Sequence, residues 1–213
     1  MIHKKRIKTN IKFDILIVGA GPAGIAFACG FANTKLKIGI IDKLPKNIIA
    51  NPKIDGREIA LTHNSVKILK KINVWPCISN KSISSIKEAR VLDGDSKYFL
   101  NFDHQEIQKK CLGYLVPNYI IKKNLYRRLK KISNITLITK AECLSLNIED
   151  RCASITLSNG EKIKSSLSFL KNKAKTLEDI YNNSKYIIQD KVTISQDDMK
   201  LLDDKAKKII SEF

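Results

Sequence analysis

Short apolar runs alternate with amphipathic segments along most of the chain, and this pattern predicts an α/β fold. Residues 14–19 and 37–42 are runs rich in isoleucine, valine and leucine, with the length typical of buried parallel strands. Residues 119–132 carry apolar positions at helical spacing and are followed by another apolar run at 135–139. We therefore expect a parallel sheet built from 14–19, 37–42 and 135–139, with helices between its strands.

Other segments predict a smaller sheet and further local elements. Residues 86–102 predict two strands about a turn at 93–95, which should form a separate sheet. The apolar positions of residues 57–75 have broadly helical spacing, so a helix is expected there, after a polar, proline-bearing loop at 43–56. The remaining expected elements are a strand within 111–118 and a hairpin series before residue 167, with a tight turn at Asn159-Gly160.

The composition changes near residue 167. All nine glycines and all five prolines lie before that point, and residues 168–213 carry nine lysines against eight acidic residues. Of the formal net charge of +18, about +17 (18 − 1) therefore belongs to the first 167 residues. We expect a basic leader at 1–12, an α/β domain at 13–167 and a helical C-terminal tail of different origin at 168–213.

The glycines after the first expected strand form a nucleotide-binding pattern. Gly19, Gly21 and Gly24 fit G-x-G-x-x-G, and Pro22 suits the first position of a helix. Gly19 would permit a tight turn, Gly21 would let backbone N–H groups approach a pyrophosphate, and Gly24 would let the helix pack closely on the sheet. Asp42 ends the second strand, where an acid accepts hydrogen bonds from a ribose and disfavours a 2′-phosphate. Together these features predict a Rossmann-like FAD/NAD(P)-binding fold.

A cleavable export signal is the alternative explanation of the N-terminal region. A basic leader precedes the apolar run at 15–29, as it does in signal peptides. The run is shorter than the about 20 apolar residues of a membrane span, and it holds three glycines and a proline. The dinucleotide-binding interpretation is therefore favoured. The alternative to it is a glycine-rich turn that binds no ligand.

The cysteines, the histidines and the net charge indicate which compartments, metal sites and partners to expect. Five scattered cysteines without a C-x-x-C pair predict a reducing compartment, with neither a disulfide framework nor a zinc site. Three histidines form no ligand-spaced cluster, so we expect no metal site and identify no catalytic residue. Nucleic-acid binding lacks an aromatic-interleaved basic motif, whereas attraction to an anionic membrane surface needs none. We expect a cytoplasmic protein that at most associates peripherally with the inner face of a membrane.

Four patterns stand in order along residues 13–167: GAGPAG with Asp42 at the end of the second strand, DGREIALTHNSVKILKKINVW, LGYLVPNYIIKKNL and ITLSNGEKIKSSL. Together these motifs resemble the flavin-dependent aromatic hydroxylases of ubiquinone biosynthesis. Their order and spacing over residues 13–167 are similar to the N-terminal part of the members that hydroxylate the ring of polyprenylated phenols.

This resemblance implies an FAD-dependent oxidoreductase, with NADH or NADPH as a transient reductant and a polyprenylated phenol as substrate. It also implies contact with the membrane or with a ubiquinone-synthesis complex. The implied FAD-binding residues are Gly19, Gly21, Pro22, Ala23, Gly24, Asp42, Arg57 and Asn118. Arg57 lies in the family's R-x-x-A-L pattern, and a solvated arginine at a helix start is the alternative. Asn118 stands where the family's helix begins beside the cofactor, and a simple helix cap is an equal alternative.

The chain also departs from this family. An Asp-Gly motif after ITLSNGEKIKSSL and a later Gly-Asp segment over the flavin are missing from the sequence. We therefore expect a truncated FAD-binding domain with part of a smaller substrate-domain sheet near 86–102, without hydroxylase turnover by itself. An inert remnant is one alternative. A basic tRNA-binding adaptor is another, because LKNKAKTLEDIYNNSKYI in the tail resembles an anticodon-binding segment of glutamyl-tRNA synthetases.

Overall fold

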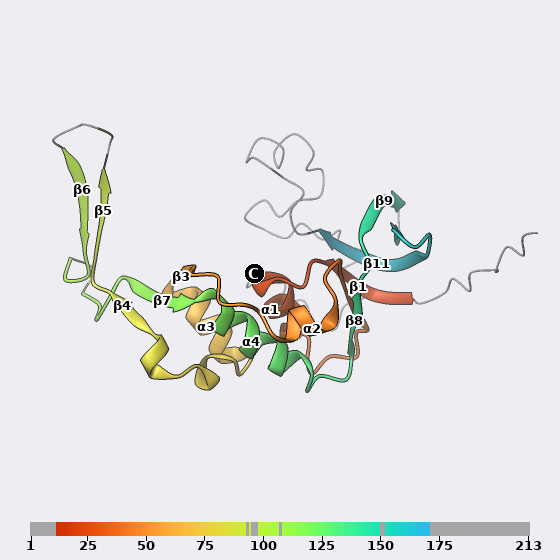
Figure 1. Cartoon of the computed structure of the whole chain (residues 1–213), viewed down its shortest axis with the longest axis horizontal. Coiled ribbons are helices and arrows are strands. Elements are labelled where there is room, and N and C mark those ends of the chain that lie inside the picture. The colour runs from red at the N-terminus through yellow and green to blue at the C-terminus, as the bar shows by residue number, and fades with distance from the viewer. Residues whose placement is uncertain (1–11, 93, 95–97, 107, 150–151, 171–213) are drawn as a thin grey trace, which may run out of the picture. The chain divides into compact units, whose positions relative to one another are not determined.

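The computed structural model describes residues 12–92, 94, 98–106, 108–149 and 152–170, which fall into two compact units (Figure 1). The first unit takes the chain up to Ile49 and from Leu129 onward, and the second unit is Ala50–Arg128. Residues 1–11 of the expected leader and residues 171–213 of the expected helical tail lie outside the described residues.

The first unit is built on a six-stranded sheet that contains the three parallel strands predicted from the sequence. The strand order is β8 (Ile135–Thr139), β2 (Ile38–Asp42), β1 (Lys12–Val18), β11 (Lys162–Leu170), β10 (Cys152–Leu157) and β9 (Cys143–Glu149). The first four of these strands run parallel to one another, and β10 and β9 extend the sheet from β11 with antiparallel pairing. The α/β fold class expected from the sequence is confirmed.

The middle of this sheet is buried on both faces, as the continuous apolar runs predicted. Ile15, Leu16 and Ile17 are consecutive and no more than 2% exposed, so side chains on both faces of β1 are covered. One apolar cluster joins the strands of both halves of the sheet: Phe13, Leu16, Ile41, Ala141, Ile155, Leu157 and Ile163. Helix α1 (Pro22–Gly30) connects β1 to β2 and contacts both strands.

Asn134 ties the start of β8 to the segment between α1 and β2. Its side-chain amide donates hydrogen bonds to the backbone carbonyls of Leu36 at 2.8 Å and Phe31 at 2.9 Å, with a longer one to Thr34 at 3.4 Å. Its own backbone carbonyl accepts from Ile38 N–H at 2.9 Å. The connection that returns the chain from α1 to the sheet therefore depends on a residue about 100 positions later.

Replacing Asn134 with alanine should lower the free energy of unfolding by about 1–2 kcal/mol, because carbonyls in a partly buried loop lose their donor. Urea unfolding followed by far-UV circular dichroism measures this loss. The matched control is Ser133→Ala, an exposed neighbour that should stay within about 0.5 kcal/mol of the parent. Equal unfolding midpoints for Asn134→Ala and Ser133→Ala would contradict the assigned role.

The second unit holds two small antiparallel sheets. One has the order β3 (Glu58–Leu61), β7 (Gly113–Pro117) and β4 (Ser84–Ile86), and the other pairs β5 (Glu88–Leu92) with β6 (Phe99–Asp103). Its helices are α3 (His63–Lys71), the short 3-10 turns Trp75–Cys77 and Asn80–Ser82, and α4 (Asn118–Leu129), which leads back to the first unit. The separate sheet expected near 86–102 is the β5–β6 pair, whereas residues 93 and 95 of its expected turn lie outside the described residues.

Two local expectations are wrong. The helix expected over 57–75 begins only at His63, because Glu58–Leu61 pairs with β7 as strand β3. Thr62 marks the change, since its side chain caps α3 by accepting the Ser65 N–H at 3.2 Å. The loop expected over 43–56 contains the short helix α2 (Lys46–Ala50), which follows Pro45. The apolar positions of Glu58–Leu61 suit the period of a strand as well as that of a helix.

Candidate functional site

The glycine-rich segment forms the turn between β1 and α1. Gly19 has a φ of +107°, a backbone conformation that side-chain-bearing residues rarely adopt. Its N–H donates to the carbonyl of Ile41 at 2.7 Å, so the turn is held against the last residues of β2. The first glycine of the motif therefore lets the chain leave the sheet at the carboxyl end of β1.

Gly24 lets α1 approach this turn closely. A Cβ atom at Gly24 would lie 2.1 Å from the backbone oxygen of Gly19 and 3.4 Å from Cγ2 of Ile17. The contact with Gly19 cannot be relieved by a side-chain rotation, because the opposing atom is backbone, whereas the distance to Ile17 is an ordinary van der Waals contact. This is the close packing that we expected of the third glycine.

The N-terminus of α1 carries no acidic group of its own. Gly21 is the N-cap residue, with φ −75° and ψ 176°, and no side chain caps the helix there. Pro22 is the first helical residue, and no acidic residue lies in the first turn. The positive end of the helix dipole and its first N–H groups are suited to an anion from outside the helix.

Asp42 lies beside the glycine turn, as the motif predicted. Its Oδ2 accepts the Ala20 N–H at 2.6 Å, and its Oδ1 accepts the Leu44 N–H at 2.8 Å. The side chain is partly exposed. The carboxylate thus has a role that the sequence did not reveal, since it fixes the backbone of the turn as well as ending β2.

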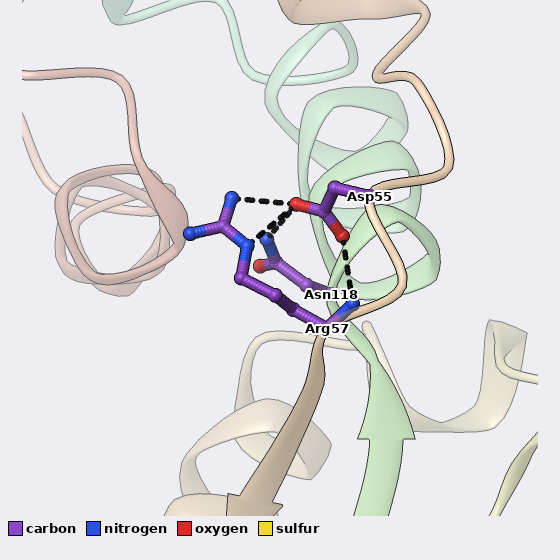
Figure 2. Close-up of polar contacts among 3 residues, drawn as sticks. All are labelled: Asp55, Arg57 and Asn118. Carbon is purple, nitrogen blue, oxygen red and sulfur yellow. Dashed lines mark hydrogen bonds and ion pairs between the residues drawn. The ribbon is translucent and has the colours of Figure 1, made fainter.

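Arg57 and Asn118 lie together in the second unit, where Asp55 joins them (Figure 2). The Oδ2 atom of Asp55 accepts from Arg57 Nε at 2.9 Å, from Arg57 Nη2 at 2.5 Å and from Asn118 Nδ2 at 2.8 Å. The Asn118 N–H donates to the Arg57 carbonyl at 2.9 Å. These three residues form one hydrogen-bonded cluster, which we call the Asp55 cluster.

The Asp55 cluster bears on the two alternatives to cofactor binding, a helix-start arginine at Arg57 and a helix cap at Asn118. Arg57 does not begin a helix, because it precedes strand β3 directly, and its side chain is 66% exposed. Asn118 is the first residue of α4, and its buried side chain donates its amide to Asp55. An N-cap side chain works as an acceptor, so this amide contact is of another kind.

Sequence reasoning missed Asp55. The signal was present as Asp55-Gly56-Arg57, in which an acid stands two residues before the arginine. Hydrogen bonds from the Arg57 side chain, and then from Asn118, lower the pKa of Asp55 from its ordinary value of 3.8 to about 2. The carboxylate is therefore ionised at any pH at which the protein would be studied, and it faces a cation.

Replacing Arg57 with alanine should raise the pKa of Asp55 from about 2 toward 3.8, because the largest cause of the shift is removed. Since the folded-state pKa is the lowered one, the contact stabilises the fold above pH 3.8, and this contribution is lost as the pH falls through about 2. Carboxyl carbon NMR titration of Asp55 measures the change. Arg90→Ala, which breaks a separate pair with Glu88, should leave this titration unmoved.

Two kinds of feature are absent from the described part of the chain. Within it, no group of three or more histidine, cysteine, aspartate or glutamate side chains is arranged to hold a metal ion. No helix among those described residues is both long enough and apolar enough to span a membrane.

Known proteins of two kinds resemble parts of this chain. No protein-family model matches it. The ubiquinone hydroxylase UbiM of Neisseria meningitidis is 36% identical over 156 residues, which is 71% of this chain and 34% of that protein. The ubiquinone hydroxylase UbiL of Rhodospirillum rubrum is 30% identical over 72% of this chain and 35% of its own length. The glutamate–tRNA ligase of Pelagibacter ubique is 69% identical over 52 residues, 24% of this chain and 11% of that enzyme.

Solved structures agree on the fold. The p-nitrophenol 4-monooxygenase PnpA of Pseudomonas putida superimposes with a TM-score of 0.58 at 11% identity, over 79% of this chain and 43% of that one. The flavin-dependent monooxygenase PieE, solved with FAD and substrate, gives 0.58 at 12% identity, over 82% of this chain and 32% of that one. The chain thus has the fold of flavin-dependent monooxygenases.

The resemblance inferred from the sequence motifs is confirmed. The chain spans about a third of the length of the ubiquinone hydroxylases that it matches. Over about 70% of its own length this protein is similar to ubiquinone hydroxylases, and over a shorter segment it is similar to a glutamate–tRNA ligase.

Proposed function

We propose that this chain binds FAD and forms the FAD-binding part of a monooxygenase that hydroxylates polyprenylated phenols in ubiquinone biosynthesis. The observation that carries the proposal is the turn between β1 and α1, where Gly19, Gly21 and Gly24 meet an uncapped helix N-terminus and Asp42. The relatives named as ubiquinone hydroxylases support the reaction class and the kind of substrate.

The residues of the turn suit the ADP part of FAD. Gly21, Pro22 and Ala23 put backbone at the start of α1 with little side chain above it, which leaves room for a pyrophosphate. Asp42 is partly exposed, and each carboxylate oxygen retains acceptor capacity beyond its one backbone donor, so the group can also accept from a ribose hydroxyl.

Arg57 and Asn118 are proposed as further cofactor ligands. A guanidinium offers fixed donors to phosphate or ring oxygens, and that of Arg57 is largely exposed. When bound, FAD would supply the redox chemistry: NADH or NADPH would provide two electrons, one oxygen atom of O₂ would enter the phenol ring, and the other would leave as water. The protein's own part is to hold and orient the cofactor and to exclude water around it.

A polyprenylated substrate also suggests where the protein works. Such a phenol partitions into lipid, so we infer that the protein meets it at a membrane surface. The formal net charge of +18 supports attraction to anionic lipid head groups.

Titration of the purified chain with FAD tests the cofactor proposal. We expect quenching or a shift of the flavin spectrum that saturates at one FAD per chain, and ADP should compete because it carries the half that the glycine turn holds. A chain that binds neither FAD nor ADP overturns the proposal and favours the inert alternative.

A tRNA-binding adaptor is the second candidate, and one observation favours it. The segment related to glutamate–tRNA ligase is 69% identical, a much higher identity than that to the hydroxylases. Electrophoresis of the same preparation with tRNA at two salt concentrations separates the candidates. Retarded tRNA without FAD binding supports the adaptor, and FAD binding without retardation supports the hydroxylase-type function.

A further inference from the structure

We infer that Asp55 is a positioning residue that orients the Arg57 guanidinium for a cofactor, an inference that rests on the proposed FAD binding. No sequence motif assigned a role to Asp55. The inference starts from geometry, because the acid contacts both residues that the sequence had singled out in this unit (Figure 2).

The contacts fix Arg57 at both ends. Asp55 Oδ2 accepts two donors of the same guanidinium, Nε at 2.9 Å and Nη2 at 2.5 Å, which sets the direction of the guanidinium plane. Asp55 Oδ1 accepts the Arg57 backbone N–H at 3.3 Å, so one carboxylate holds the backbone and the tip of the same residue. A long flexible side chain is thereby held in one arrangement before any ligand arrives.

Asn118 anchors this pair to the framework of its unit. Its side chain is buried, its amide donates to Asp55 at 2.8 Å, and its backbone N–H donates to the Arg57 carbonyl at 2.9 Å. Asp55 and Asn118 are 63 residues apart in sequence, so the contact joins the segment before β3 to the start of α4. The Arg57 side chain nonetheless stays 66% exposed, which leaves its outer edge accessible to a ligand.

Removing Asp55 should change the affinity for an anionic ligand in two opposite ways. The direction of the net change tests whether Asp55 positions Arg57. Loss of the negative charge should strengthen attraction to the phosphates of FAD. Loss of positioning should weaken binding, because the guanidinium must then be ordered by the ligand itself. We expect positioning to win, with FAD bound about tenfold more weakly by Asp55→Ala.

The chain offers a matched control in the Glu88–Arg90 pair. It also joins an acid to an arginine two residues later, with Nε to Oε1 at 2.9 Å and Nη2 to Oε1 at 2.8 Å. Both of its side chains are exposed, at 59% for Arg90 and 44% for Glu88. Glu88→Ala therefore removes a comparable charge and ion pair, and it should leave FAD affinity unchanged.

The experiment compares FAD dissociation constants for the parent chain, Asp55→Ala, Arg57→Ala, the double variant and Glu88→Ala. The expected result is that the double variant binds no more weakly than Arg57→Ala alone, because Asp55 acts through Arg57. The near-isosteric Asp55→Asn serves in place of Asp55→Ala if the alanine variant does not fold. Unchanged or tighter FAD binding in the Asp55 variants, or additive losses in the double variant, would overturn the inference.

A second readout needs no cofactor. In the parent chain without FAD, the Arg57 Nε–H should give a slowly exchanging NMR resonance, which Asp55→Ala abolishes and Glu88→Ala preserves. If the parent chain does not bind FAD, the proposed function is wrong and Arg57 does not bind FAD. The Nε–H resonance then still decides whether Asp55 holds Arg57, so the two failures are distinguishable.

Discussion

Replacing Gly24 with alanine is expected to lower the free energy of unfolding by about 3 kcal/mol, the upper part of the range for overpacked sites. The added Cβ would lie 2.1 Å from the backbone oxygen of Gly19, well inside contact distance. Because the opposing atom is backbone, α1 or the glycine turn must move. Gly19 is itself held by a hydrogen bond to Ile41, and Ile25 in α1 is buried, so neither side yields easily.

Thermal or urea unfolding of the purified variant measures this loss. The matched control is Ala23→Gly, the reverse change at the neighbouring exposed position of the same helix turn. It meets no such contact and should cost no more than about 1 kcal/mol through helix propensity. If Gly24→Ala were as stable as Ala23→Gly, the close approach of α1 to the turn would be wrong.

The strands of the first unit could be predicted because their signal is local. β1 and β2 contain short apolar runs at 15–18 and 38–41, which strands buried on both faces require, and β8 is a mixed Ile-Thr-Leu-Ile-Thr segment that is only partly buried. β3 was missed because Ile59 and Leu61 suit a period of two as well as the helical period of the following residues. Pairing with β7 decides between the two, and this partner lies more than 50 residues away.

In the candidate site, too, the residues within one local motif were predicted, and those placed by distant contacts were missed. The glycine pattern and Asp42 were predicted together because both lie at the carboxyl ends of strands in the same βαβ unit. Asp55 was missed because its partners are fixed by tertiary contacts, including one to Asn118 across 63 residues. The parallel pairing of β11 with β1 was also not predicted, since it joins segments about 150 residues apart and leaves no local trace. Contacts of this kind follow from the folded framework, and no spacing within one segment encodes them.

Replacing Gly21 with valine is expected to weaken FAD binding at least about 100-fold, which corresponds to about 2.7 kcal/mol. The N-cap position at the start of α1 is the place where the proposed pyrophosphate comes closest to the backbone, and a branched side chain there would occupy that space. Fluorescence titration with FAD measures the loss. Gly21→Ala should fall between valine and glycine, because it adds a single methyl group.

The backbone at Gly21 makes this variant informative. Its φ of −75° and ψ of 176° are extended values that valine adopts without strain, so loss of binding would not arise from a broken turn. The cost to folding should be about 1 kcal/mol, since valine is a poorer N-cap than glycine. Asn33→Val, at an exposed position beyond the other end of α1, controls for adding a valine and should bind FAD as the parent does. A folded Gly21→Val chain with parental FAD affinity would show that the glycine turn is not where the cofactor binds.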